Sequence, residues 1–425
     1  MRNNSRHGKS LRRDVNPSSI AGLLLLMILS AVVAAEEAPA LLPFQVQADV
    51  AHRELSPKFC WFHPRVAALP GFGNDRQPAV IMTIQKHLAA SDHYSGLYFL
   101  RSNDLGKTWA SPTEIPELAW QQGPNNETIA VCDVTPGWHA PSGKLVAIGT
   151  RLRYSPKGDQ LLDQPRSHSC AYATFDPRTN QWTTWKVLAT PETDGKFFLV
   201  APGCVQWLVR QDGTLLIPMY FKGQSGSDYQ TTVLHCSFDG RELKYAAHGN
   251  ELAMRGGRGL YEPSLALHDG TYYLTLRNDS RAYVTTSTDG LHFAPPKPWT
   301  FDNGQDLGSY NTQAHWLTHS AGLFLTYTRR GANNDHIARH RAPIFVAQVD
   351  PKTLQVIRQT EQVLLPERGV MLGNFGAAAI TPQESWVTDA EYIMSDKPNA
   401  RGADGTVWAG RIKWSKPNRT VTSPN

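Results

Sequence analysis

The densest group of reactive side chains in the sequence lies in the segment Thr328 to Pro343 (TRRGANNDHIARHRAP). It contains four arginines, two histidines and one aspartate, which are Arg329, Arg330, Asp335, His336, Arg339, His340 and Arg341. Guanidinium groups bind carboxylates through paired hydrogen bonds, and histidine can act as a base near neutral pH. No further clustered carboxylate accompanies Asp335 and the two histidines, so we expect no metal ion and no other cofactor. The composition predicts a site for an anionic ligand, with a solvated basic loop as the alternative.

This segment separates two strand-like runs, and similar runs recur along the chain. Each is rich in Val, Ile, Thr, Tyr or Phe and is bounded by Gly, Pro, Asn or Asp. The runs are Pro78–Gln85, Gly96–Ser102, Lys144–Leu152, Thr214–Phe221, Thr231–Phe238, Thr271–Asn278, Ala282–Thr288, Gly322–Arg329, Pro343–Asp350, Glu384–Tyr392 and Thr406–Trp414. No comparable stretch repeats apolar residues with the period of a helix. We therefore predict a single all-β domain over residues 36–415, followed by a polar tail at 416–425.

Several of these strands run into similar turns that contain an aspartate. These are Asp104, Asp176, Asp239, Asp289 and Asp350, and successive ones are 72, 63, 50 and 61 residues apart. A repeat of this length that contains strands but no helix is typical of a propeller blade. The 390 residues after residue 35 have room for six blades, so the predicted fold is a six-bladed β-propeller. The aspartates are expected to accept hydrogen bonds from the N–H groups of their own turns, which is a structural role.

The first 35 residues have the order of a secretory signal. A polar, basic start is followed by the apolar run Ile20–Ala35, which ends in small residues before Glu36. Its 16 residues are short of the roughly 20 that a membrane span needs. We expect a secreted or periplasmic protein with no other membrane-spanning segment, and an uncleaved anchor is the alternative. The basic start also carries most of the net charge of +5, so a nucleic-acid partner is not expected.

The five cysteines show no metal-binding spacing. They are Cys60, Cys132, Cys170, Cys204 and Cys236, with no Cys-x-x-Cys pair and no close Cys/His cluster. An oxidising compartment permits one or two disulfides, and buried free thiols fit the sequence equally well. We therefore predict no structural zinc site and leave the cysteine pairing open.

The turn Ser102–Trp109 (SNDLGKTW) resembles an Asp-box, the repeat of bacterial neuraminidases. On this turn and its looser copies, the chain resembles the sialidase superfamily over most of Phe59 to Tyr392. The resemblance implies a six-bladed propeller with its active site at the central mouth. It also implies a glycoside hydrolase that acts on a glycan with a terminal acidic sugar.

Three segments resemble functional parts of that superfamily. Ser91-Asp92-His93 resembles the stretch with the acid/base aspartate, which implies that Asp92 protonates the leaving oxygen. Tyr261-Glu262-Pro263-Ser264 resembles the segment whose glutamate partners the nucleophile, and Arg277, which follows it, would bind the substrate carboxylate. The segment Arg339-His340-Arg341 resembles the one with the third arginine, which implies a substrate-binding role for Arg341 beside Arg339 and His340.

Two positions depart from the superfamily pattern. The first arginine would be Arg65, in Phe62-His63-Pro64-Arg65, which lacks the usual Arg-Ile-Pro order. The nucleophilic tyrosine would fall in Gly373-Asn374-Phe375-Gly376, where Phe375 cannot attack a sugar. Tyr310 and Tyr392 are the candidate substitutes.

These departures keep two other functions open. One is a polysaccharide lyase or other glycosidase that acts on a uronic-acid polymer with His336 or His340 and Tyr310. The other is a propeller that binds carbohydrate without cleaving it. The oligomeric state is not predicted.

Overall fold

The computed structural model describes residues 39–421, apart from 90–91, 162–167 and 192–194. The predicted signal at residues 1–35 lies outside the described residues, as do the last four residues of the predicted tail. From Ala40 onward the chain forms one unit.

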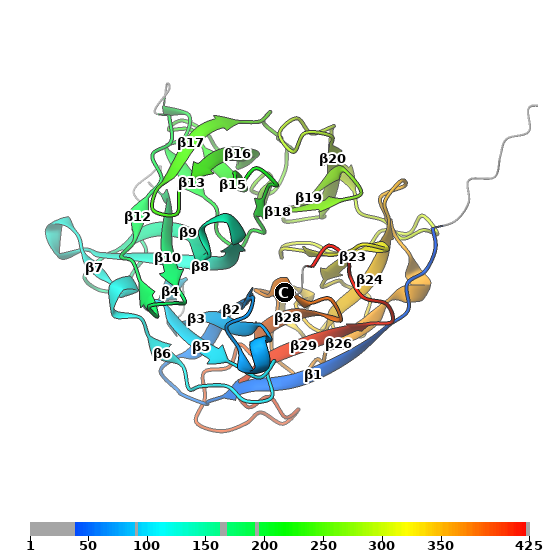
Figure 1. The fold of residues 1–425 in the computed structure, drawn as a ribbon, viewed down its shortest axis with the longest axis horizontal. Helices are drawn as coiled ribbons and strands as arrows, with labels where there is room; N and C mark the ends of the chain where they lie inside the picture. Colours follow the sequence, from blue (N-terminus) through cyan, green and yellow to red (C-terminus); the bar gives the residue numbers. More distant parts are fainter. Residues whose placement is uncertain (1–38, 90–91, 162–167, 192–194, 422–425) are drawn as a thin grey trace, which may run out of the picture. The chain divides into compact units, whose positions relative to one another are not determined.

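Six antiparallel sheets surround a central axis (Figure 1). Blade 1 contains β2 (Cys60–Leu69), β3 (Ala79–Ala89), β4 (His93–Tyr94), β5 (Tyr98–Ser102) and β6 (Thr113–Glu114). Blade 2 contains β7 (Gln121–Gln122), β8 (Thr128–His139), β9 (Lys144–Tyr154), β10 (Ser169–Asp176), β11 (Gln181–Trp182) and β12 (Lys186–Val187). Blade 3 contains β13 (Leu199–Ala201), β14 (Leu208–Val209), β15 (Leu215–Lys222), β16 (Gln230–Phe238) and β17 (Leu243–His248).

The second half of the chain repeats this arrangement. Blade 4 contains β18 (Tyr261–His268), β19 (Thr271–Arg277), β20 (Tyr283–Ser287) and β21 (Lys297–Pro298). Blade 5 contains β22 (His315–His319), β23 (Gly322–Tyr327), β24 (Ile344–Asp350), β25 (Gln355–Val356) and β26 (Gln362–Leu365). Blade 6 contains β27 (Gly376–Thr381), β28 (Glu384–Ala390), β29 (Thr406–Trp414) and β1 (Phe44–Arg53). The predicted six-bladed propeller is confirmed.

The N-terminal strand closes the ring. β1 is the outermost strand of blade 6 and pairs antiparallel with β29, from Phe44 opposite Trp414 to Arg53 opposite Thr406 (Figure 1). Blade 6 is thereby built by hydrogen bonds between strands from the two ends of the domain. This pairing covers the edge of β29, which would otherwise present unpaired backbone groups.

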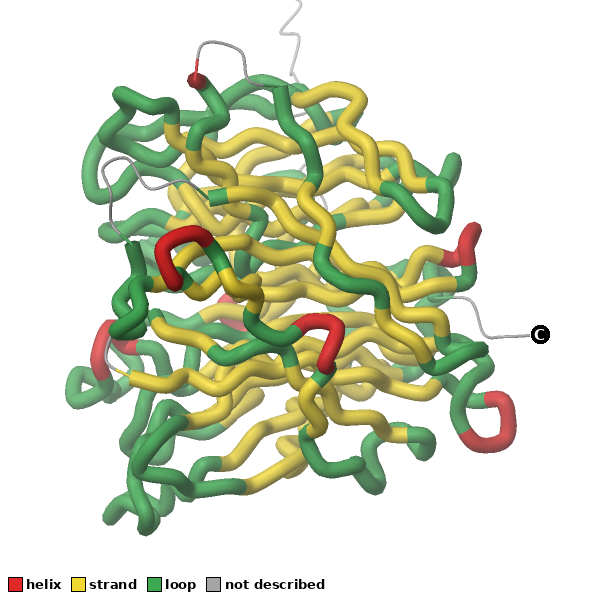
Figure 2. Tube along the Cα trace, turned by 90° about the vertical axis from the view of Figure 1, so that its left-hand side faces the viewer, coloured by secondary structure: helices red, strands yellow, loops and turns green. Residues whose placement is uncertain are grey.

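Helical structure is confined to single 3₁₀ turns within the part of the chain that the structure describes (Figure 2). They are η1 (Asn74–Arg76), η2 (Pro116–Leu118), η3 (Pro124–Asn126), η4 (Ala140–Ser142), η6 (Ala338–His340) and η7 (Arg358–Thr360). None of the helices in that part is long and apolar enough to cross a membrane.

The aspartate turns hold together as the sequence predicts. Asp104 accepts hydrogen bonds from the N–H of Thr108 at 2.9 Å and from its hydroxyl at 2.7 Å, while the Gly106 N–H donates to Ser102 Oγ. The Trp109 ring at the end of the turn lies 6.1 Å from that of Trp386 in blade 6. The turn therefore packs one blade against its neighbour, which is a structural role.

All five cysteines are buried free thiols. Of the two alternatives that the sequence left open, the structure has the one without disulfides. Burial raises the pKa of the Cys60 thiol to about 12, so this group is a neutral part of the core.

Candidate active site

All six blades contribute to one polar cavity of about 210 Å³. Its lining consists of His63, Asp92, Tyr94, Cys132, Asp133, Thr150, Leu152, Gln160, His168, Cys204, Tyr220, Tyr229, Arg258, Tyr261, Glu262, Arg277, Arg339, Arg341 and Asn374. Residues from every blade can meet only near the propeller axis, so the cavity lies at the centre of the ring. This cavity lies where the resemblance implies an active site.

A larger cavity of about 890 Å³ is lined mainly by small and apolar residues, among them Ala67, Trp207 and Ala378. Titratable side chains are sparse in it compared with the smaller cavity. Because chemistry needs converging charged groups, we place the candidate active site in the smaller cavity.

Four successive blades direct a polar side chain into the cavity from a similar backbone position. His63, Asp133, Cys204 and Glu262 have positive φ angles of 53°, 58°, 57° and 44°. The strand register shifts around three of them, in β2, β8 and β18. Such bulges turn a side chain out of the sheet, and each left-handed non-glycine residue costs about 1–3 kcal/mol. This strain, repeated around one cavity, makes it the candidate functional centre.

One wall of the cavity is cationic. Arg277 Nη1 donates to Glu262 at 2.5 Å, and its Nη2 donates to Asn311 Oδ1 at 2.8 Å. Arg341 Nη2 donates to the backbone oxygen of Asn311, also at 2.8 Å. Burial would lower the pKa of Arg277, but the charge and hydrogen bond of Glu262, together with Tyr261 and Cys204, raise that pKa.

Of the two buried arginines in this wall, Arg341 has its charge less fully compensated. Burial, together with the nearby charge of Arg277, lowers its pKa to about 10. An anion placed between the two guanidinium groups would offset this repulsion. The wall is therefore suited to bind a carboxylate.

Asp92 is an exposed carboxylate on the cavity lining. The Tyr94 hydroxyl donates to Asp92 Oδ1 at 3.1 Å, and the Tyr154 hydroxyl donates to the Asp92 backbone oxygen at 2.8 Å. Its φ of 40° shows that the backbone is held in an uncommon conformation. Asp92 is thus fixed at the cavity while its carboxylate stays accessible to a ligand.

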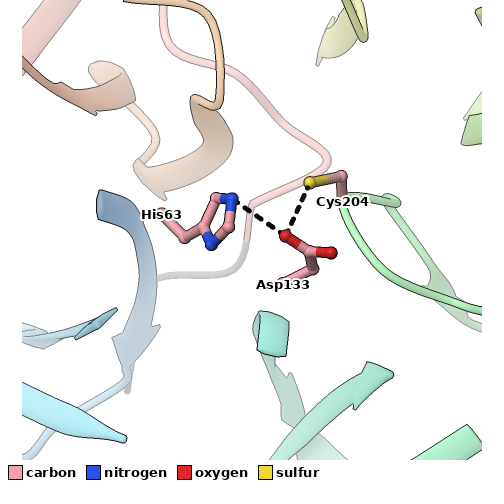
Figure 3. A group of neighbouring side chains, drawn as sticks. All are labelled: His63, Asp133 and Cys204. Atoms are coloured by element: carbon pink, nitrogen blue, oxygen red, sulfur yellow. Dashed lines mark hydrogen bonds and ion pairs between the residues drawn. The ribbon is translucent and has the colours of Figure 1, made fainter. Parts of the chain in front are cut away.

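A second carboxylate, Asp133, lies deeper. Its Oδ1 is 2.8 Å from His63 Nε2 and accepts a hydrogen bond from the Cys204 thiol at 3.3 Å (Figure 3). Burial would raise the pKa of Asp133, but the charges of His63 and Arg65 lower it well below its usual range. Asp133 is therefore ionised in the folded protein.

The structure brings together five of the nine residues proposed from the sequence. Asp92, Glu262, Arg277, Arg339 and Arg341 all line the cavity. Arg65 is not part of the lining. It is 1% exposed, donates from Nη1 to the Val134 backbone oxygen at 3.4 Å, and packs against Gly376, where a Cβ would lie 2.5 Å from Arg65 Cγ.

The other three proposed residues lie apart from the lining. The Tyr310 hydroxyl is 2.6 Å from His340 Nδ1, and His340 Nε2 is 3.1 Å from Asp335. The Tyr392 ring packs against Phe62, with 5.7 Å between the ring centroids. These contacts account for Tyr310, His340 and Tyr392 without a ligand.

The segment Gly373–Gly376 presents an amide to the cavity. Asn374 is part of the lining, whereas Phe375 is fully buried and its ring lies edge-on to His315 at 5.0 Å. The side chain that reaches the cavity from blade 6 is therefore Asn374, which is not a nucleophile for a sugar.

His63, Asp133 and Cys204 were not among the residues proposed from the sequence. Each comes from the innermost part of its blade, at an equivalent place in Phe62-His63-Pro64, Cys132-Asp133-Val134 and Gly203-Cys204-Val205. Tyr261-Glu262-Pro263 shares this order of apolar or small, polar, apolar residues. Aligning the innermost strands of the blades would have revealed them.

The loop that carries Asn374 is held by a buried carboxyl group. The Gly373 N–H donates to Asp389 Oδ2 at 2.5 Å, and the Ala390 N–H donates to Oδ1 at 2.8 Å. Burial raises the pKa of Asp389 to about 7, against the lowering effect of these two N–H groups.

We expect Asp389 to contribute a stabilisation of the folded protein that falls as the pH rises from 4 to 7. Between its unfolded pKa near 4 and its folded pKa, the folded chain holds a proton that the unfolded chain has released. The contribution is therefore complete below pH 4 and lost above pH 7. Denaturant unfolding of the wild type and Asp389→Asn across this range checks it. The wild type should lose stability relative to the variant as the pH rises through this range, and parallel profiles would contradict the assignment.

No model of a known protein family matches the chain, and no curated protein matches its sequence. Solved structures match its fold. One is a protein of unknown function from Dyadobacter fermentans DSM 18053, at 15% identity and a TM-score of 0.62, covering 87% of this chain and 99% of that one. Another is the Trypanosoma rangeli sialidase in complex with sialic acid, at 13% identity and a TM-score of 0.56, covering 88% of this chain.

A third is the K499G mutant of the NanB sialidase from Streptococcus pneumoniae, at 13% identity and a TM-score of 0.56, covering 89% of this chain and 71% of that one. The present chain spans 60% of the trypanosome enzyme. At these identities the likeness shows a propeller fold of the sialidase type.

Proposed function

We propose that the protein is a sialidase-type glycoside hydrolase that removes a terminal acidic sugar from glycans outside the cytoplasm. The observation that carries this proposal is the meeting of an accessible carboxylate, Asp92, and the buried arginines Arg277 and Arg341 in one axial cavity. In this proposal the arginines bind the sugar carboxylate and Asp92 protonates the leaving oxygen. Arg339, on the same lining, adds to the positive potential. The sialidase neighbours, one of them solved with sialic acid, support this choice of fold and substrate class.

A non-catalytic sugar-binding propeller is the second candidate. Asn374 reaches the cavity where the sialidase pattern would have a tyrosine, and Phe375 is buried away from it. A cavity with the arginines, in which none of the lining tyrosines Tyr94, Tyr220, Tyr229 and Tyr261 attacks the sugar, would bind an acidic sugar and leave it intact. The lyase alternative has less support, because His336, His340 and Tyr310 are absent from the described lining of the cavity.

The deciding experiment measures sugar release from an α-sialoside with a chromogenic leaving group. Sustained turnover supports the hydrolase. Saturable binding of free sialic acid without turnover supports the binding protein. If the protein neither cleaves the sialoside nor binds free sialic acid, sialic acid is overturned as the ligand. A uronic-acid polymer, monitored for an unsaturated product that absorbs in the ultraviolet, tests the lyase in parallel.

Arg341→Met should weaken the binding of sialic acid by about 10–150-fold, since hydrogen bonds to charged groups contribute about 1.5–3 kcal/mol. Isothermal titration checks this value. A neutral sugar alcohol of similar size should bind both proteins equally, because it lacks the carboxylate. Arg281→Met is the matched control, since Arg281 is half exposed in a surface ion pair with Asp306. Equal loss in the two variants would contradict a specific role for Arg341.

A further inference from the structure

The geometry points to a binding site for a soft divalent metal ion of the zinc class, made by His63, Asp133 and Cys204. We propose this site independently of the glycosidase proposal, since metal binding requires no glycan. It revises the expectation from the sequence that the chain binds no metal.

The three side chains offer three types of ligand atom in a small volume. An imidazole nitrogen, a carboxylate oxygen and a sulfur all lie within 4.8 Å of one another. His63 Nε2 and Asp133 Oδ1 are 2.8 Å apart, and Cys204 Sγ is 3.3 Å from the same oxygen (Figure 3). Tetrahedral zinc with normal bond lengths separates such ligand atoms by about 3.3–3.6 Å. Small outward shifts of the side chains would therefore admit the ion.

The backbone is arranged to bring these residues together from three blades. All three have left-handed φ angles, although none is glycine. The Cys204 N–H donates to the Asp133 backbone oxygen at 3.2 Å, which links blades 3 and 2. Gly203 permits this approach, because a Cβ there would lie 2.8 Å from Asp133 Cβ. Strain of about 1–3 kcal/mol per residue persists where a function requires the geometry.

The surrounding groups support a metal ligand role for Asp133. The Cys132 thiol lies 3.7 Å from Asp133 Oδ2, so it holds the oxygen that does not face His63 and Cys204. Outer hydrogen bonds of this kind orient ligating carboxylates. A thiolate and a carboxylate would offset both charges of a divalent ion, and neutral imidazole completes the set.

Three protein ligands leave one tetrahedral position open. Because His63, Asp133 and Cys204 all line the axial cavity, that position faces it. Sites with three protein ligands and one open position are typical of zinc that binds a water molecule or a ligand oxygen. The bound ion would present its free position to whatever occupies the cavity. The chemical preference is for zinc or cobalt over calcium or magnesium, since a thiolate is a soft ligand.

Metal analysis of the purified full chain, after chelation and back-titration with Co²⁺ and Zn²⁺, tests the site. We expect one equivalent of zinc. With Co²⁺ we expect a thiolate-to-cobalt charge-transfer band in the near ultraviolet and the visible bands of a tetrahedral ion. Cys204→Ser and His63→Asn should each weaken Co²⁺ binding at least about 100-fold, because loss of even an outer partner costs about 10–100-fold.

The control is Cys170→Ser, which changes a buried free cysteine outside the cavity lining and should leave the cobalt spectrum unchanged. Alkylation footprinting gives a readout that needs no variant, since zinc should protect Cys204 and leave the reactivity of Cys170 unaltered. Absence of a thiolate band in the wild type would overturn the proposal and leave a hydrogen-bonded His-Asp-Cys group. Undiminished cobalt binding in both ligand variants would overturn it as well.

Discussion

Asp92→Asn should lower kcat for an alkyl α-sialoside by about 10²–10⁴, the usual contribution of a positioned general acid. The structure supports the prediction because the Asp92 carboxylate is accessible on the cavity lining. Its backbone is tied to Tyr154 and its side chain to Tyr94, so the amide can take the same place. The variant should therefore still bind free sialic acid with the wild-type Kd.

Substrates with different leaving groups distinguish a general acid from a residue that has only a structural role. A nitrophenolate leaves without a proton, so the loss of kcat for a nitrophenyl sialoside should be much smaller than for the alkyl sialoside. Kinetics of both substrates with the wild type and Asp92→Asn make the comparison. Asp212→Asn, which changes an exposed turn carboxylate in blade 3, is the matched control. An equal fractional loss for the two substrates would contradict proton donation by Asp92.

The sequence predicted the central strands of the blades much better than the innermost strands or the outermost ones, such as β1 and β17. All eleven predicted runs overlap observed strands, from β3 to β29. The innermost strands β2, β8, β18, β22 and β27 were missed. β2 contains Pro64 and β18 contains Pro263, and β27 begins Gly-Ala-Ala-Ala, which is not the β-branched pattern of a regular strand. Small residues and bulges are what the crowded axis requires, so the strand signal is weak there.

The same cause explains which parts of the site could be predicted. Glu262 and Arg277 were found because their segments resemble a known motif, while Asp133 and Cys204 belong to no motif that the sequence shows. Their common feature is a left-handed backbone conformation within or beside the innermost strands, where the sequence predicted no strand to align. Phe375 shows the limit of the motif. It occupies the motif position of the nucleophilic tyrosine but is fully buried, and its neighbour Asn374 lines the cavity.

Arg277→Met should destabilise the folded protein by about 3–5 kcal/mol, because it leaves a buried carboxylate unpaired. The side chains of Arg277 and Glu262 are only 5% and 13% exposed. Arg277 also lies over the Tyr261 ring, 4.6 Å from its centroid, so the lost guanidinium removes a cation–π contact too. Denaturant unfolding at pH 7 measures the change. Arg281→Met is the control, since its ion pair with Asp306 is half exposed and should contribute no more than about 1 kcal/mol.

The double variant Arg277→Met/Glu262→Gln separates stability from binding. Removing both charges should recover most of the lost stability, because neither charge is then buried alone. Binding of sialic acid should not recover, since the guanidinium that would hold the carboxylate is still absent. Recovery of stability without binding would mean that Glu262 keeps Arg277 charged and in place for an anionic ligand. Recovery of both stability and binding would contradict a role for Arg277 in binding the sugar carboxylate. The Arg277–Glu262 pair would then have a structural role, and Arg341 would be the remaining buried arginine of the cavity.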